Sequence, residues 1–228
     1  MRRISRGALA ALLVAGLAVG AWAIAPLASQ ASNGHAAERG SADRTGAIGR
    51  LRFHEQMLKL WEDHVTWTRL FIVSFAAGLP DQEQTAARLL QNQVDIGDAI
   101  KPFYGVAAGD QLTSLLRQHI LTAVDVLTAA KAGDQSGLQT ALKAWYRNAR
   151  EIADFLHAAN PRNWSRADMR AMMKAHLDLT LREASDRLAG NYDADVADYD
   201  AVVKEILRMA NMLANGIIAQ FPGRFSSV

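Results

Sequence analysis

Trp-Glu-Asp-His-Val-Thr-Trp-Thr-Arg, residues 61–69, contains a pattern that returns twice further along the chain. In each copy a histidine is followed directly by an aliphatic residue, and in two of the three copies a threonine stands four positions after the histidine. The three histidines are His64, His119 and His176, which are 55 and 57 residues apart. Each lies inside an apolar pattern with helical spacing, so the chain is predicted to contain three copies of one helical hairpin.

Residues 51–225 are predicted to form an all-α domain, a six-helix bundle built from three repeated antiparallel hairpins. Apolar residues recur there at intervals of three and four positions, which is the periodicity of amphipathic helices. Breaks with glycine or proline separate six helical parts, at 78–80, 102–105, 133–134, 160–161 and 190–191. Asp81, Asp110 and Ser165 are predicted N-caps. The short loops favour antiparallel neighbours, and no segment shows the alternation expected of a strand.

The first 31 residues are predicted to be a signal peptide or a membrane anchor. Three arginines precede an apolar run without charge over residues 7–24, and Ser29 and Ala31 provide the small residues of a cleavage site. If it is not cleaved, the apolar run approaches the roughly 20 residues that a helix needs to cross a bilayer. Residues 7–24 are the only part of the chain expected to attach it to a membrane. Residues 32–50, rich in Gly, Ala and Ser, are predicted to be a flexible linker. The protein is therefore expected to be extracytoplasmic, secreted or anchored by its N-terminal segment.

Composition removes several classes of function. The 228-residue chain has no cysteine, which excludes disulfides, cysteine-ligated metals and thiol nucleophiles. Cleavage after residue 31 changes the formal net charge from +2 to −1, so no basic stripe for nucleic acid remains. The chain contains neither a phosphate-binding glycine loop nor a Gly-x-Ser-x-Gly motif. A protein or a small molecule is therefore the kind of partner expected.

The three histidines are the candidate site, because equivalent positions of a repeat lie at equivalent depths. Three histidines with an open position are a known zinc arrangement, and neutral imidazole also suits copper or nickel. Hairpins that stack in a row would instead separate the histidines by about 10 Å. Aligning the second helix of each hairpin on its C-terminal end predicts five facing polar groups. These are Asn92, Asp98, Asn148, Asp154 and Asn215.

Two interpretations of these residues remain open. The favoured one is structural, in which each buried imidazole is satisfied by a polar residue on the facing helix. The function expected with it is an extracytoplasmic helical binding, interaction or structural module. The alternative is a metal- or cofactor-binding protein, enzymatic or not, that uses the histidines with the facing Asn and Asp residues. A ferritin-like di-iron site is rejected, since only Asp154 with His157 approaches its Glu-x-x-His pattern.

Several motifs between about residues 57 and 225 carry a resemblance to known sequences. They include Trp61-x-x-His64-x-x-Trp67-Thr-Arg, Trp145-Tyr-x-Asn148-Ala, His176-Leu-x-Leu-Thr180 and Gln220-Phe-Pro. On these motifs the chain resembles an uncharacterised family of small bacterial helical-bundle proteins, some of whose members carry enzyme names such as acetylglutamate kinase or glycosyltransferase. The resemblance implies a helical fold and transfers no catalytic residue. A kinase or nucleotide-sugar transferase would need an α/β nucleotide-binding fold, which the sequence does not predict.

Overall fold

In the computed structural model the backbone is described for residues 30–225 and the side chains for residues 44–225. The helices are α1 (Gln30–Ala77), α2 (Gln82–Tyr104), α3 (Val106–Ala132), α4 (Gln135–Ala159), α5 (Arg166–Ala189) and α6 (Tyr192–Gln220), followed by the short 3-10 helix η1 (Pro222–Phe225). No strand occurs within residues 30–225. The prediction of an all-α helical bundle is therefore confirmed.

The N-terminal part differs from the sequence-based expectation. Two compact units divide the chain, residues 1–39 and residues 40–228. The predicted signal or anchor segment falls outside the described residues up to position 29, whereas the predicted linker, 32–50, is helical as part of α1. No proline interrupts this stretch, and its alanines are the strongest helix formers, so its scattered glycines do not end the helix. Among the described helices, none is both long and apolar enough to cross a membrane.

Left-handed glycines and a serine cap define several of the helix ends. Gly133 after α3 and Gly190 after α5 have φ values of 69° and 77°, which residues with a Cβ rarely adopt. Ser165 caps α5 as predicted, because its side chain accepts a hydrogen bond of 3.1 Å from the backbone nitrogen of Asp168.

Two predicted caps do not form. The side chain of Asp81 makes no capping hydrogen bond to α2 and instead accepts one of 2.8 Å from the Ser74 hydroxyl. Asp110 lies inside α3, because this helix begins at Val106 directly after Gly105. Gly105 has a φ of 86°, so the chain turns at one residue and needs no longer loop before the next helix.

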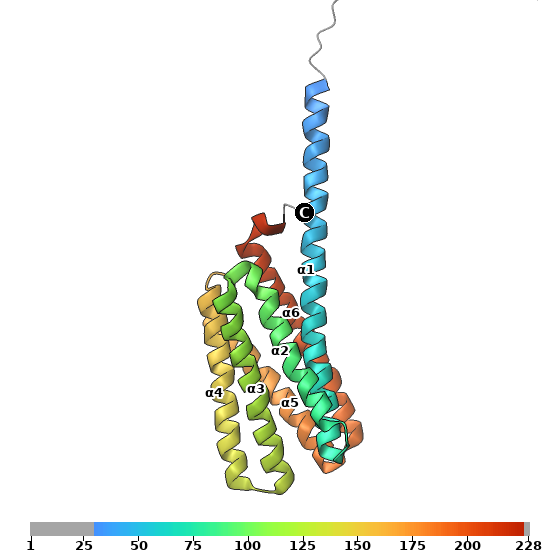
Figure 1. The fold of residues 1–228 in the computed structure, drawn as a ribbon, viewed down its shortest axis with the longest axis vertical. Helices are drawn as coiled ribbons and strands as arrows, with labels where there is room; N and C mark the ends of the chain where they lie inside the picture. The colour runs from blue at the N-terminus through green and yellow to red at the C-terminus, as the bar shows by residue number, and fades with distance from the viewer. Residues whose placement is uncertain (1–29, 226–228) are drawn as a thin grey trace, which may run out of the picture. The chain divides into compact units, whose positions relative to one another are not determined.

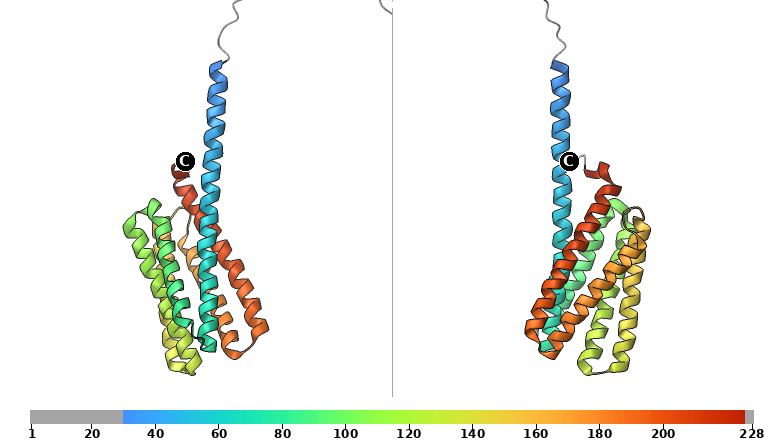
Figure 2. Two further views of the ribbon diagram at one scale, coloured as in Figure 1. Left: turned by 45° about the vertical axis from the view of Figure 1, so that its right-hand side comes forward. Right: turned by 180° about the vertical axis from the view of Figure 1, so that it is seen from behind.

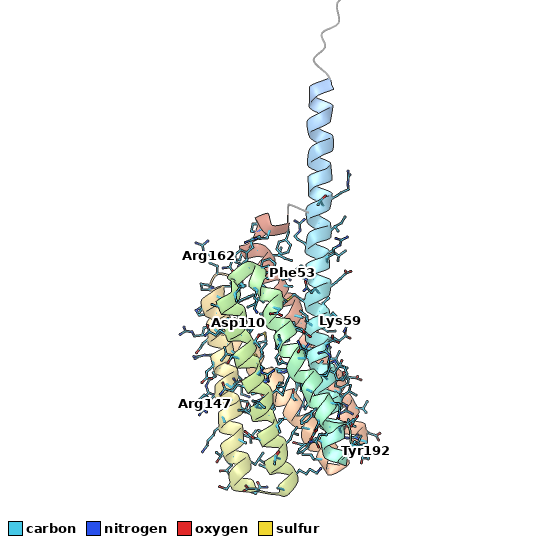
Figure 3. The ribbon with its side chains drawn as sticks, in the orientation of Figure 1. Phe53, Lys59, Asp110, Arg147, Arg162 and Tyr192 are labelled. Carbon is cyan, nitrogen blue, oxygen red and sulfur yellow. The ribbon has the colours of Figure 1, made fainter. Side chains whose placement is uncertain are left out.

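Helices α2 to α6 pack in chain order, each against the next and antiparallel to it (Figure 1). Residues of α1 within the second unit join this bundle beside α2 and α6 (Figure 2). The Asn92 side chain on α2 donates a 3.0 Å hydrogen bond to the Leu60 carbonyl, and Asn215 on α6 lies 3.0 Å from His54 Nε2. Charged side chains such as Arg147 point away from the bundle (Figure 3).

Two apolar clusters fill the interior, and the histidines lie where one gives way to the other. The residue three positions before each histidine belongs to the larger cluster, and these residues are Trp61, Leu116 and Met173. The smaller cluster begins after the histidines and consists of Phe71, Ile72, Leu89, Ile120, Leu127 and Ala184. The larger cluster also continues past the histidines through Val65, Val126 and Leu177, so the buried polar layer interrupts the apolar core without dividing it.

Candidate metal centre

The structure brings the three histidines together in the core. His64 on α1, His119 on α3 and His176 on α5 are only 3, 3 and 4% exposed. One ring nitrogen of each lies within 4.8 Å of a ring nitrogen of each of the others. The ring centroids are 5.7 to 6.4 Å apart. The three helices therefore converge on one point and do not place the imidazoles in a row.

Each imidazole is oriented through its Nδ1 by a polar side chain on the helix that follows. The partner lies 29 residues after the histidine in all three cases. The partners are Gln93 on α2, Asn148 on α4 and Glu205 on α6, at 3.2, 3.1 and 3.2 Å. Because Nδ1 faces this outer partner, Nε2 is the ring nitrogen left for a ligand at the centre.

Further hydrogen bonds hold the backbone around two of the histidines. Asn92 and Asn148 donate to the carbonyls of Leu60 and Leu115, each four residues before a histidine, at 3.0 and 3.1 Å. Thr68 and Thr180, the threonines noted in the sequence pattern, donate to the carbonyls of the histidines four positions earlier at 2.7 and 3.0 Å. These threonines therefore satisfy backbone carbonyls and are not directed at the imidazoles.

Aromatic rings complete the walls of the centre. Trp145 on α4 stacks on His119 with centroids 5.6 Å apart and planes at 28°. Trp61 meets His64 edge-on, with centroids 5.9 Å apart. Both indoles are buried, so the imidazoles are held by rigid rings as well as by hydrogen bonds.

Burial keeps at least two of the imidazoles neutral. Desolvation lowers the pKa of His64 well below its ordinary value, and the neighbouring His176 and His119 lower it further. Desolvation, with a smaller effect of His176, lowers the pKa of His119 to about 3. Neutral imidazole is the form that coordinates metal ions, so no deprotonation is needed at neutral pH.

The spacing of the nitrogens fits one small metal ion. Metal–nitrogen bonds of about 2.0–2.1 Å place three ligand nitrogens roughly 3.4 Å apart in a tetrahedral site. The observed nitrogens lie within 4.8 Å of one another. Each must therefore move toward the common centre by less than about 1 Å, a shift that small side-chain rotations provide.

Gln93 is the outer partner whose hydrogen bonds correspond to the metal-free state. Its Nε2 faces three acceptors, the Leu89 carbonyl, Asn92 Oδ1 and His64 Nδ1. Its Oε1 is buried without a hydrogen-bond partner among the described residues. Coordination of a metal through Nε2 of His64 requires a proton on its Nδ1. Metal binding would therefore require the Gln93 side chain to rearrange, because its Nε2 donates to the Leu89 carbonyl and to Asn92 Oδ1 where it stands.

Of the five polar groups expected to face the histidines, two lie in this layer. Asn148 contacts His119 directly, and Asn92 adjoins His64 through Gln93. The sequence alignment missed Gln93 and Glu205, because it was set on the C-terminal ends of the second helices, and these helices extend by different lengths beyond the facing residue. A constant spacing of 29 residues from each histidine would have found both.

The structure does not bring the other three to the centre. Their polar atoms are engaged by charged or polar side chains elsewhere on the bundle. The pairs are Asp98 with Lys101 at 2.7 Å, Asp154 with Arg170 at 2.7 Å and Asn215 with His54 at 3.0 Å. The residue that does face the histidine in each hairpin lies five to ten positions before the predicted one in the sequence. That position is level with the histidine on the preceding helix.

A buried ion cluster lies next to this layer along α1 and α5. Arg69 donates to both carboxylate oxygens of Asp195 and, at 3.1 Å, to Glu183. Both carboxylates are 1% exposed. Desolvation raises the pKa of Glu183 to about 7, although Arg69 opposes this shift. The cluster joins α1, α5 and α6 mainly through the Arg69 guanidinium, and Arg187 lies 3.5 Å from Asp195 as a second basic partner.

The buried titrating groups predict how the metal-free protein responds to pH. His64 and His119 have depressed pKa values, so below the ordinary value of 6.5 the unfolded state binds more protons and stability falls on acidification. The raised pKa of Glu183 has the opposite effect on stability between pH 4.5 and about pH 7. In this range the native state holds a proton on Glu183 that the unfolded state has lost. Two histidines oppose one carboxyl, so the net effect predicted for acidification is a loss of stability.

Urea unfolding between pH 4.5 and 6.5 measures this slope. Glu183→Gln removes the opposing contribution, so stability should fall more steeply on acidification in this variant than in the wild type. A free energy of unfolding that does not change across this window, in both proteins, would contradict neutral buried imidazoles.

The fold and the polar layer together define an all-α bundle with a buried cluster of three imidazoles. Comparison of the chain with protein-family models, with curated proteins and with solved structures gives no match.

Proposed function

We propose that the protein is an extracytoplasmic helical metal-binding module. Its site is formed by Nε2 of His64, His119 and His176. The observation that carries the proposal is the meeting of three buried imidazole nitrogens within 4.8 Å of one another. Three outer partners that orient the rings through Nδ1 support it, because ligating histidines in proteins use such partners.

Structural pairing alone explains less of this arrangement. If the histidines were only structural, a hydrogen bond from each Nδ1 to its partner on the next helix would be enough. Three such histidine–partner pairs would have no reason to lie close to one another. In this protein they do meet, and one ring nitrogen of each histidine lies within 4.8 Å of the others in a buried layer. A shared ion would engage all three nitrogens at once, which is why the geometry favours the metal-binding alternative.

The donor set suggests the class of metal. Three neutral imidazoles suit zinc, copper or nickel, and they form a poor site for calcium or magnesium, which prefer oxygen ligands. Glu205 contributes a carboxylate that is itself nearly buried and lies 3.2 Å from Nδ1 of His176. Its charge would offset part of the ion's charge in the core and increase the basicity of His176.

We also propose that the bundle arose from three repeats of one helical hairpin. The spacing of 29 residues between each histidine and its outer partner supports this. So do the two asparagines that bond the carbonyl four positions before a histidine. In this proposal each repeat supplies one ligand, and a complete site requires all three.

Glu205→Gln tests the role of the outer partner. The amide oxygen can still accept from Nδ1 of His176, but the charge is lost, so the affinity for Zn²⁺ or Cu²⁺ should fall roughly 10–100-fold. Isothermal titration of the metal-free protein measures the change. Asp98→Asn is the matched control, because it removes one carboxylate from an exposed position and should leave the affinity unchanged. Equal affinities in wild type and Glu205→Gln would exclude this role.

The extracytoplasmic location rests on the basic residues, apolar run and small-residue site within positions 1–31. Cleavage after Ala31 would release the protein, whereas retention would leave it anchored. N-terminal sequencing of protein recovered from outside the cytoplasm distinguishes the two. Recovery of a cytoplasmic protein that begins at Met1 would contradict both.

A further inference from the structure

The three outer partners present different kinds of atom to the histidines, although they occupy equivalent positions. The facing atom is an amide nitrogen in the first hairpin, an amide oxygen in the second and a carboxylate oxygen in the third. The pairs are Gln93 with His64, Asn148 with His119 and Glu205 with His176. The first hairpin therefore offers its histidine a hydrogen-bond donor where the other two offer an acceptor.

The orientation of the Gln93 amide is fixed by the other groups around it. Its Nε2 donates to the Leu89 carbonyl at 2.8 Å and to Asn92 Oδ1 at 3.2 Å. A carbonyl can only accept, and the Asn92 amide is fixed in turn because its nitrogen donates to the Leu60 carbonyl at 3.0 Å. Exchanging the nitrogen and oxygen of Gln93 would place its oxygen against two acceptors. Its nitrogen is therefore the atom that faces His64.

This orientation decides which nitrogen of His64 carries the proton in the metal-free protein. Burial depresses the pKa of His64, which keeps the ring neutral with a single N–H. An amide nitrogen donates and does not accept, so Nδ1 of His64 has to be the acceptor. Both side chains are buried, so bulk water offers no alternative partner. The proton is therefore on Nε2, and it occupies the lone pair with which this nitrogen would bind an ion.

The other two imidazoles have the opposite tautomer. The Asn148 nitrogen donates to the Leu115 carbonyl at 3.1 Å, which turns its oxygen toward Nδ1 of His119. Nδ1 of His176 lies 3.2 Å from the carboxylate of Glu205, which accepts. Both histidines therefore carry the proton on Nδ1 and keep the lone pair of Nε2 available for an ion.

We propose that Gln93 holds His64 in the tautomer that cannot bind metal, so that two ligands of the site are ready and the third joins only after a rearrangement. This inference rests on the proposed metal site. On binding, the proton leaves Nε2 of His64 and Nδ1 takes one up, so the ring stays neutral while the Nε2 lone pair forms the bond to the ion. Gln93 then has to give up hydrogen bonds to Leu89 and Asn92. It is a positioning residue that weakens binding and makes the ion easier to release.

The histidine tautomers of the full-length protein test this directly. Nitrogen NMR of isotopically labelled protein distinguishes an imidazole nitrogen that carries a proton from one that carries a lone pair. In the metal-free protein we expect the proton on Nε2 of His64 and on Nδ1 of His119 and His176. One equivalent of Zn²⁺ should move the proton of His64 to Nδ1.

The outcomes of this titration separate the two proposals. A metal-free His64 with its proton on Nδ1 overturns the inference and leaves the proposed function intact. The same holds for a zinc-loaded protein in which His64 keeps its proton on Nε2 while His119 and His176 bind the ion. A wild-type protein that takes up no Zn²⁺ refutes both.

Gln93→Glu provides a second test. A carboxylate accepts from Nδ1 of His64, so this histidine should change tautomer without metal and the affinity for Zn²⁺ should rise at least about tenfold. Asn148→Asp is the matched control, because it adds the same charge beside His119 and also loses an amide donor, but it changes no tautomer. An affinity in Gln93→Glu no higher than in Asn148→Asp overturns the proposal. If Gln93→Glu does not fold, the tautomer of His64 in the wild type decides.

Discussion

His176→Ala lowers the affinity for Zn²⁺ or Cu²⁺ by more than about 100-fold, beyond the roughly 10–100-fold that loss of an outer partner costs. The reason is that one of the three imidazole ligands is lost, and Glu205 is left buried without its partner. His64→Ala and His119→Ala should have effects of the same size, since each supplies one of three equivalent ligands. Quenching of tryptophan fluorescence by Cu²⁺ measures binding, because Trp145 stacks on His119.

His54→Ala is the matched control for these variants. His54 lies on α1 with His64 and bonds Asn215 at 3.0 Å, away from the three-imidazole cluster. Its replacement should leave the affinity within a factor of about two, as expected for an independent site. Loss of binding in His54→Ala, or full binding in His176→Ala, would move the metal away from the buried cluster.

Arg69→Met lowers the free energy of unfolding by about 3–5 kcal/mol, the cost of removing one partner from a buried ion cluster. Asp195 and Glu183 are both 1% exposed and both accept from this guanidinium. Arg187, 3.5 Å from Asp195, can compensate only in part. For a domain of this size the melting temperature should fall by roughly 2–4 °C per kcal/mol, or about 10 °C in all.

The measurement is thermal unfolding of Arg69→Met, with Arg147→Met as the comparison variant. Arg147 has a side chain 62% exposed and lies 3.9 Å from Glu151, so its loss should change stability by under about 0.5 kcal/mol. The difference in free energy of unfolding between Arg69→Met and the wild type should also become smaller as the pH falls. Protonation of Asp195 and Glu183 removes the charges that the substitution leaves unpaired. Equal melting temperatures for the two variants would show that the cluster does not stabilise the fold.

Much of the fold could be predicted from local signals. Glycine or proline occurs in the connections between the helices, and Gly133 and Gly190 adopt the left-handed conformation that ends α3 and α5. Residues 32–50 are part of α1, and glycine content alone does not break a helix that lacks proline. The start of α3 was placed too late, since a one-residue turn at Gly105 leaves no loop to recognise.

The site could be predicted only in part. Spacing between His64, His119 and His176 identified the ligands, because a repeat preserves position. Whether the imidazoles meet depends on the rotation of each helix about its axis, and no pattern along one helix specifies that rotation. The outer partners were partly missed because helix ends are a poor reference when the helices extend by different lengths beyond the residue that faces the histidine.

The most direct test is elemental analysis and X-ray absorption of the protein purified without an affinity tag and loaded with Zn²⁺ or Cu²⁺. The proposal predicts one ion per chain with three imidazole nitrogens at about 2.0–2.1 Å. It predicts no bound ion in a protein with His64, His119 and His176 all replaced by alanine. Substoichiometric metal in the wild type, or equal metal in the triple variant, would contradict the proposed function.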